Sequence, residues 1–263
     1  MRAAEVIVES VSFGVDDFKH QGFRDKAIEL SAITKQYIQE HCGPWLSQAG
    51  SGVAYRGISE RAKQGRVLFT HPVRTDRRPK DSTASTHEFF NDLISLTGGV
   101  ANRSNSAFVT PSISTAENYG QACVVMPVGE FSYTWSPDIK DWYSQEIGVR
   151  GWWDPQLVMQ HVSQDLIHRT LARVQMPAQA GQELETLTRL RNQHVSRSAD
   201  FAIFANLGSH CYSAQSVAEH IWADKGLETA LDRGNEIMIH CGEMLYLDAV
   251  YHGAMINYHV SPF

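Results

Sequence analysis

The sequence predicts an α+β fold with a mostly antiparallel sheet, and three observations support this prediction. Short apolar segments typical of strands fall in two groups along the chain. Amphipathic segments with helical spacing lie between these groups but do not alternate regularly with the strands, as a doubly wound sheet would require. No GxGxxG phosphate-binding motif occurs in the 263 residues.

The first half of the chain contains strands and helices that glycine or proline ends. Two amphipathic helices are expected at Asp25–Cys42, before Gly43-Pro44, and at His87–Leu96, before Gly98-Gly99. Their apolar faces are Ile28, Ile33, Tyr37 and Ile38 in the first helix, and Phe90, Leu93 and Ile94 in the second. The other expected elements are strands at Val6–Val11, Gly52–Gly57, Ala107–Thr110, Cys123–Pro127 and Glu130–Trp135 (the last two joined at Gly129), a polar loop at Arg66–Ser85, and a short helix at Ser114–Tyr119 capped by Ser114 or Thr115.

The second half of the chain begins with long polar segments of helical spacing. Pro155–Gln175 and Gln182–Val195 are expected to be helices, separated by a break at Met176-Pro177-Ala178. We interpret residues 152–200, approximately, as a helical insertion in a single domain that spans residues 1–263. The later expectations are a strand at Phe201–Ala205, a helix at Ser213–Ala223, a loop at Trp222–Arg233, strands at Asn235–His240 and Met244–Val250 around Gly242, and an edge or loop at His252–Val260.

The composition narrows the class of protein. With 43% hydrophobic residues the chain can bury a substantial core, and its net charge of −6 argues against a global basic face for nucleic acid. Glu5 and Glu9 interrupt the first apolar stretch, and no run of apolar residues is long enough to span a bilayer. The four cysteines lack CxxC spacing, so we expect reduced thiols and no metal site. We therefore expect a soluble cytoplasmic protein.

Three segments, far apart in the chain, each set a polar group into a strand-like run. In Ala54-Tyr55-Arg56-Gly57, the planar guanidinium of Arg56 suits a phosphate or a carboxylate, and a structural salt bridge is the alternative. Gly57 has no side chain, so a ligand could approach its backbone. In Arg233–His240, Glu236 precedes three apolar residues. A carboxylate placed there is costly unless it is paired or used, or unless it faces solvent at a strand end.

The remaining segment, Phe108-Val109-Thr110-Pro111-Ser112, carries a hydroxyl pair. Taken in order, the three segments resemble the arginine–serine–glutamate branch of the mono-ADP-ribosyltransferases, which use NAD. The resemblance implies a split β core of two packed, mostly antiparallel sheets with N-terminal helices. It places Arg56 on the NAD phosphate and ribose, and the backbone of Gly57 on the nicotinamide. Pro111 departs from the threonine that is usual in the middle of the hydroxyl motif.

The same resemblance assigns roles to the other motif residues. Tyr55 and Phe108 are the aromatic positions of their motifs, while Thr110 and Ser112 take the outer hydroxyl places, from which Thr110 orients the glutamate. Glu236 would stabilise the ribosyl cation that forms as nicotinamide leaves. Tyr119 either walls the nicotinamide pocket or belongs to the core.

Two further features bear on the substrate. The position two residues before Glu236, where the family often has Glu or Gln, is Gly234, which leaves the acceptor open and argues against arginine modification. The string around Arg77 and a run at Asn102–Thr110 resemble phage-associated proteins of ADP-ribosyltransferase type. Arg77 and Arg103 are candidate phosphate or substrate contacts, or else solvated surface charges.

The resemblance predicts an NAD-dependent mono-ADP-ribosyltransferase, a toxin-like effector that modifies a protein side chain or an RNA or DNA base. An antitoxin protein is a further expected partner of such a toxin. An NAD glycohydrolase with water as acceptor uses the same three segments and remains open. So does a catalytically inert binding or virion protein that keeps the fold.

Overall fold

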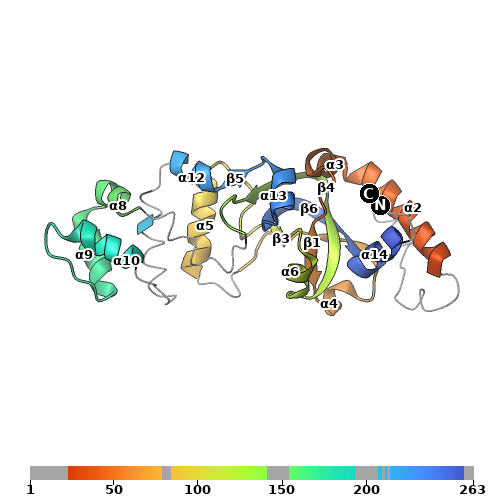
Figure 1. The fold of residues 1–263 in the computed structure, drawn as a ribbon, viewed down its shortest axis with the longest axis horizontal. Helices are drawn as coiled ribbons and strands as arrows, with labels where there is room; N and C mark the ends of the chain where they lie inside the picture. Colours follow the sequence, from red (N-terminus) through yellow and green to blue (C-terminus); the bar gives the residue numbers. More distant parts are fainter. Residues whose placement is uncertain are drawn as a thin grey trace.

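The computed structural model describes residues 23–78, 84–140, 154–192, 207–208, 211 and 214–257. Within these residues the chain forms an α+β fold, in which six strands form one sheet and helices flank it (Figure 1). Every strand pair described is antiparallel. The predicted fold class is therefore confirmed, whereas the strands predicted at Val6–Val11 and Phe201–Ala205 lie outside the described residues.

Two long strands, β4 (Gln121–Trp135) and β6 (Ile237–Asp248), form the centre of the sheet. Their register shifts at a bulge between Val128 and Phe131, where Gly129 has φ 72°, in the left-handed region that glycine favours. The prediction of two packed sheets was wrong in this respect, because both strands run through the whole of one hydrogen-bonded sheet. Gly129 and Gly242 lie inside long strands rather than in turns between short ones.

The bulge divides the sheet into two parts with different partner strands. On one side, β1 (Tyr55–Ile58) pairs with β4, and β2 (Leu68–Pro72) pairs with β6. On the other side, β3 (Ala107–Val109) pairs with β6, and β5 (Trp222–Ala223) pairs with β4. The polar loop predicted at Arg66–Ser85 was wrong where β2 lies, because this strand buries Leu68 and Phe69 at its start and is completed by pairing with β6.

The main core lies between the sheet and the helices α2 (Phe23–His41), α3 (Gly43–Ala49) and α14 (Ala249–Asn257). The face of α2 that contributes to it contains Leu30, Tyr37 and Ile38, and Ile28 is 41% exposed, so the predicted face was wrong at that residue. The edge or loop predicted at His252–Val260 is also corrected, because α14 continues to Asn257 and buries Tyr251 and Met255.

A second apolar cluster lies where β6 begins. It joins α5 (Ala84–Leu96) and α12 (Ala214–His220) to Met238, and it includes the predicted helix face of Phe90, Leu93 and Ile94. The sequence beyond β5 forms the helix α13 (Leu227–Arg233) where we predicted a loop. Buried Leu227, Ala230 and Leu231 explain this helix, because they lie at helical spacing and pack into the main core.

The predicted insertion contains three shorter helices, α8 (Pro155–His161), α9 (Gln164–Arg173) and α10 (Glu183–Asn192), rather than two long ones. The first predicted helix breaks at Ser163, whose side chain accepts a bond from the backbone N–H of Leu166 and caps α9. These helices share their own apolar cluster at one end of the molecule (Figure 1). Residues 152 and 200, the predicted boundaries, lie outside the described part of the chain.

None of the described helices combines the length and the apolar character that crossing a membrane requires.

A buried ion pair joins the short helix α4 (Glu60–Lys63) to the end of β6. The ammonium of Lys63 bonds the carboxylate of Asp248, and the two side chains are 1% and 0% exposed. Asp248 also accepts bonds from the Gln121 amide and the Val250 backbone N–H. With its partner and these donors, the carboxylate is satisfied in a site that water does not reach.

The turn that follows α6 (Ile113–Glu117) lies directly against β1. A Cβ added to Gly57 would come within 2.1 Å of the Ala116 carbonyl oxygen, and a Cβ added to Gly120 within 2.5 Å of the Ile58 carbonyl oxygen. Both obstacles are backbone atoms, which cannot turn away as a flexible side chain could. The two glycines therefore set how closely β1 and the α6–β4 turn approach each other.

Replacing Lys63 with Met should destabilise the protein by about 3–5 kcal/mol, because Asp248 would stay buried without its cation. The free energy of unfolding, measured by urea denaturation, tests this. Arg61→Met on the exposed side of α4 is the control and should change stability by less than about 0.5 kcal/mol. Equal unfolding midpoints for the two variants would show that the ion pair contributes little.

Gly57→Ala should cost about 3 kcal/mol, because the methyl group collides with backbone. Gly242→Ala in β6 is the matched control, since a Cβ there meets nothing within 4 Å. Thermal unfolding of both variants compares them directly. A Gly57→Ala protein as stable as Gly242→Ala would contradict the close approach of β1 and the α6–β4 turn.

Candidate functional site

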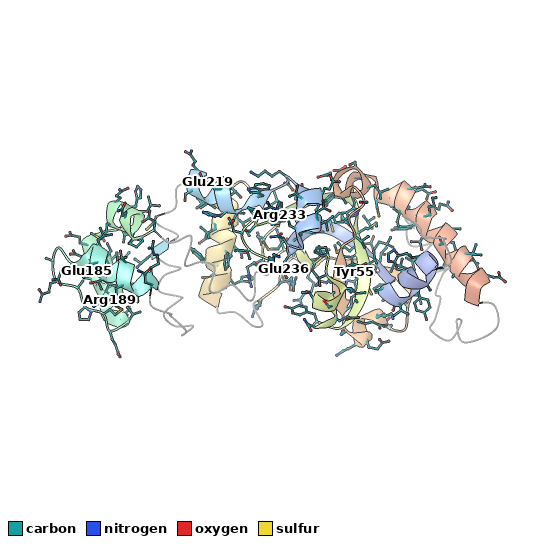
Figure 2. All side chains as sticks on the ribbon, in the orientation of Figure 1. Tyr55, Glu185, Arg189, Glu219, Arg233 and Glu236 are labelled. Atoms are coloured by element: carbon teal, nitrogen blue, oxygen red, sulfur yellow. The ribbon has the colours of Figure 1, made fainter. Side chains whose placement is uncertain are left out.

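The ends of β1, β3 and β6 meet at one place and bring the three predicted segments together. Tyr55 and Thr110 exchange two backbone hydrogen bonds, of 2.7 and 2.9 Å, which join β1 to the end of β3. Val109 of β3 pairs with Ile237 of β6, and Glu236 is the next residue outward from that pair. Figure 2 shows Tyr55 and Glu236 in the central part of the molecule. Arg56, Thr110 and Glu236 therefore lie on adjoining strand ends.

A row of carbonyl groups along β3 positions two arginines beside this junction. The carbonyl of Thr110 accepts the backbone N–H of Tyr55. The carbonyl of Phe108 accepts a guanidinium N–H of Arg56 at 3.0 Å, and that of Ser106 accepts one from Arg77 at 2.7 Å. Carbonyls of alternate residues point to the same edge of a strand. Along the edge of β3 that faces away from β6, two arginine side chains therefore bond the carbonyls of Ser106 and Phe108, and β1 bonds the carbonyl of Thr110.

Arg77 is held by further contacts. Its backbone N–H donates to the Ser104 carbonyl, and its guanidinium lies 4.8 Å from the centre of the Phe108 ring. Ser104 is itself fixed by α5, because its hydroxyl bonds the His87 ring at 2.8 Å and the Asn91 amide at 2.9 Å. Phe108, predicted as an aromatic position of the site, therefore contributes a ring face and a carbonyl to two different arginines.

The arginines raise the local positive charge. Burial lowers the pKa of Arg77 to about 10, and the neighbouring charges of Arg56, Arg74 and Arg103 lower it as well, while the charge of Glu236 acts in the opposite direction. Within the part of the chain that the structure describes, neither Arg56 nor Arg77 forms a salt bridge with a carboxylate. Among the described residues, the hydrogen-bond acceptors of these two half-buried guanidinium groups are neutral carbonyls, an arrangement that favours a bound anion.

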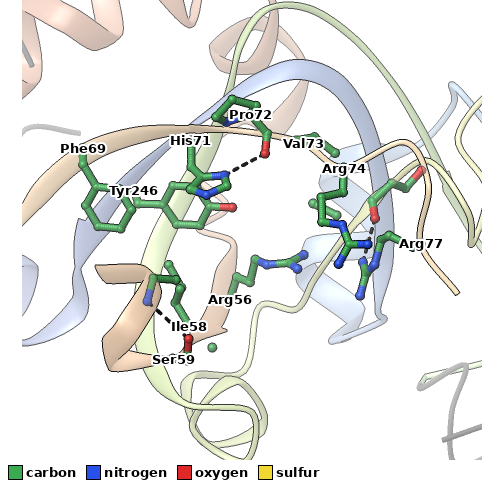
Figure 3. Close-up of a pocket in the computed structure, with 14 residues that line it drawn as sticks. Arg56, Ile58, Ser59, Phe69, His71, Pro72, Val73, Arg74, Arg77 and Tyr246 are labelled. Carbon is green, nitrogen blue, oxygen red and sulfur yellow. Dashed lines mark hydrogen bonds between the residues drawn. The ribbon is translucent and has the colours of Figure 1, made fainter. Parts of the chain in front are cut away.

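A cavity of about 230 Å³ opens beside the two arginines (Figure 3). No carboxylate is among the residues that line it, which are Arg56, Gly57, Ile58, Ser59, Ala62, Phe69, His71, Pro72, Val73, Arg74, Arg77, Ser106, Ala107 and Tyr246. The cavity includes three predicted site residues, Arg56, Gly57 and Arg77. Thr110 and Glu236 do not line it; they lie at the strand junction on which Arg56 borders.

The two predicted hydroxyls differ in their surroundings. Thr110 is buried, and its Oγ1 accepts the backbone N–H of Ser112 at 3.2 Å. Ser112 is the N-cap of α6, because its Oγ accepts the backbone N–H and the hydroxyl of Thr115. The predicted caps, Ser114 and Thr115, were wrong. The lone pairs of the Ser112 hydroxyl serve the helix cap, which leaves Thr110 as the hydroxyl at the junction.

Tyr119 and Gly57 also differ from their predicted surroundings. Tyr119 is 55% exposed after the end of α6, so its alternative as a core residue is excluded. Gly57 lines the cavity, but the backbone that approaches it closely is the chain's own α6–β4 turn. The absence of a side chain at this position is explained by packing.

The two residues before Glu236 have structural roles within the fold. Asn235 is buried, and its amide donates to the carbonyls of Ser136 and Ile139 at 2.7 and 2.9 Å. Gly234 ends α13 with a φ of 79°. The backbone N–H of Glu236 donates to the Lys140 carbonyl at 2.7 Å. These bonds fix the position of Glu236 at the start of β6.

Sequence reasoning missed most of the cavity wall, including its three aromatic side chains, Phe69, His71 and Tyr246. Phe69 and His71 fall in the segment predicted as a polar loop, so their strand was not recognised. Tyr246 was read as an ordinary residue of the predicted strand Met244–Val250. No spacing in the sequence links these positions to Arg56, because only the pairing of β2 with β6 brings them together.

No family model, no curated protein and no solved structure matches this chain.

Proposed function

We propose that this protein is an NAD-dependent mono-ADP-ribosyltransferase that acts, as a toxin-like effector, on an intracellular macromolecule. The observation that carries the proposal is the meeting of Arg56, Thr110 and Glu236 at the ends of β1, β3 and β6. The resemblance of the three segments supplies these residues in chain order, and the strand pairing that brings the segments together supports the proposal.

The proposed mechanism assigns binding to the arginines and charge stabilisation to the carboxylate. Arg56 and Arg77 hold the diphosphate of NAD, for which their unneutralised charge is suited. The bond between the ribose anomeric carbon and the nicotinamide nitrogen breaks, and nicotinamide leaves with the electron pair. Glu236 stabilises the positive charge that develops on the ribose, and Thr110 orients it. The acceptor then attacks the anomeric carbon and loses its proton.

The acceptor is a protein side chain or a nucleobase in this proposal. A specific observation also favours water, and thus an NAD glycohydrolase, as the second candidate. Gly234 has no side chain, and the amide of Asn235 is bonded to two carbonyls inside the fold. Neither residue before Glu236 can therefore activate an acceptor nucleophile. Among the possible acceptors, water depends least on groups of the protein to position it.

We expect Glu236→Gln to reduce NAD consumption at least about 100-fold, because removing a charge-stabilising group has effects of this size. Release of nicotinamide from NAD, followed by chromatography, measures this. Glu130→Gln, at an exposed carboxylate on β4, is the control and should keep normal turnover. Near-normal turnover in the Glu236 variant would show that this carboxylate has no catalytic role.

The acceptor class can be read from labelled NAD incubated with the protein and a cell lysate. Label that is lost on nuclease treatment identifies a nucleic acid, and label that is lost on protease treatment identifies a protein. Nicotinamide release without labelled polymer identifies the glycohydrolase. Absence of NAD consumption by the folded protein, after removal of any bound inhibitor, would overturn the proposed function in favour of an inert binding protein.

A further inference from the structure

Tyr246 places a buried hydroxyl at the wall of the cavity. The residue lies in β6 and is 6% exposed, and it is one of the residues that line the cavity. Its ring is stacked on that of Phe69, with centroids 5.1 Å apart and planes 6° from parallel. The stacking fixes the direction of the ring, and Figure 3 shows the hydroxyl end pointing toward the guanidinium end of Arg56.

The fold offers this hydroxyl almost nothing to bond. Among the described residues, its one hydrogen-bonding partner is the thioether sulfur of Met244 at 3.9 Å, which is a weak acceptor. A buried hydroxyl usually has a strong partner, so a donor aimed into a cavity without one indicates a ligand. Burial raises the pKa of Tyr246, which keeps the hydroxyl protonated and able to donate.

The hydroxyl shares the cavity with the two arginines held by β3. Arg56, Arg77 and Tyr246 all line this cavity, and the charges of both arginines act on the tyrosine. The arginines bond carbonyls two residues apart on one strand, a spacing of about 7 Å. The cavity therefore offers two cationic donors at such a spacing and one hydroxyl donor, and no carboxylate lines it. These donors suit a ligand with two linked anionic groups.

We propose that the cavity is a diphosphate-binding site in which the Tyr246 hydroxyl donates to the phosphate oxygens beside Arg56 and Arg77. The ligand class is a nucleotide diphosphate. Its identity as part of NAD rests on the proposed function, but the donor set does not. Tyr246 thereby becomes a binding residue that no sequence motif indicates, since a tyrosine in an apolar strand reads as core.

Calorimetric titration of the whole protein with inorganic pyrophosphate tests the site directly. Tyr246→Phe keeps the ring and its stacking on Phe69 and removes only the hydroxyl. We expect it to weaken pyrophosphate binding about tenfold, because a hydrogen bond to a charged group is lost. Arg77→Gln should weaken binding by about tenfold or more for the same reason.

Tyr37→Phe is the matched control. Tyr37 is also a buried tyrosine, its hydroxyl has no hydrogen-bond partner among the described residues, and it does not line the cavity. This variant should bind pyrophosphate as the unaltered protein does. Equal affinity of the Tyr246→Phe and Tyr37→Phe proteins would overturn the proposal, as would absence of pyrophosphate binding by the unaltered protein.

Competition identifies the source of the phosphate groups. ADP is expected to displace pyrophosphate, and orthophosphate at the same concentration is expected to displace much less. If ADP does not compete, the site does not take a nucleotide and the proposal fails.

This result is separable from the proposed function. Pyrophosphate binding that depends on Tyr246, without NAD consumption, would contradict the proposed transferase activity and support the diphosphate site. Undiminished NAD affinity and turnover in the Tyr246→Phe protein would contradict the role of Tyr246 in the diphosphate site and support the proposed transferase activity.

Discussion

The edge of β3 that faces away from β6 is the constraint on which the rest of the site depends. Its carbonyls at Ser106, Phe108 and Thr110 must each be bonded, because a buried carbonyl without a donor costs free energy. β1 provides a donor only at Thr110. The guanidinium groups of Arg77 and Arg56 provide the other two. The hydrogen bonds of this strand edge are therefore completed by Arg56 and Arg77, which also bring positive charge to the cavity.

The fold was predictable where a segment carries its own signal. The buried face of α5 follows from the spacing of Phe90, Leu93 and Ile94, which needs no knowledge of distant residues. The strand β2 is different, because a five-residue segment ending in His71 and Pro72 becomes a strand only when β6 supplies its hydrogen bonds. Ile28 shows the same limit within a helix, since the side of α2 that faces the core depends on where the sheet lies.

In the candidate site, the meeting of two segments was predictable because each carries a residue whose chemistry is unusual in its local sequence. Arg56 within a strand and Glu236 before an apolar run are both costly without a partner, and the structure brings their segments together. Ser112 was harder to assign, because a serine before a short helix serves as its cap as readily as it serves a ligand. Tyr246 gave no local signal at all. Its significance comes from the direction of its hydroxyl, which only the stacking on Phe69 determines.

The choice of carbonyl rather than carboxylate partners decides what the arginines can do. A carboxylate would hold a guanidinium equally firmly but would also cancel its charge. A carbonyl fixes the direction of the side chain and leaves the charge in place, so the arginines remain able to attract an anion. The charges of the two arginines repel each other, and a bound anion would offset that repulsion. Burial is the largest cause of the lowered pKa of Arg77, and the charge of Arg56 adds to it. The same strand edge thus positions the cations and makes anion binding favourable, and Glu236 lies close enough for its charge to act on Arg77.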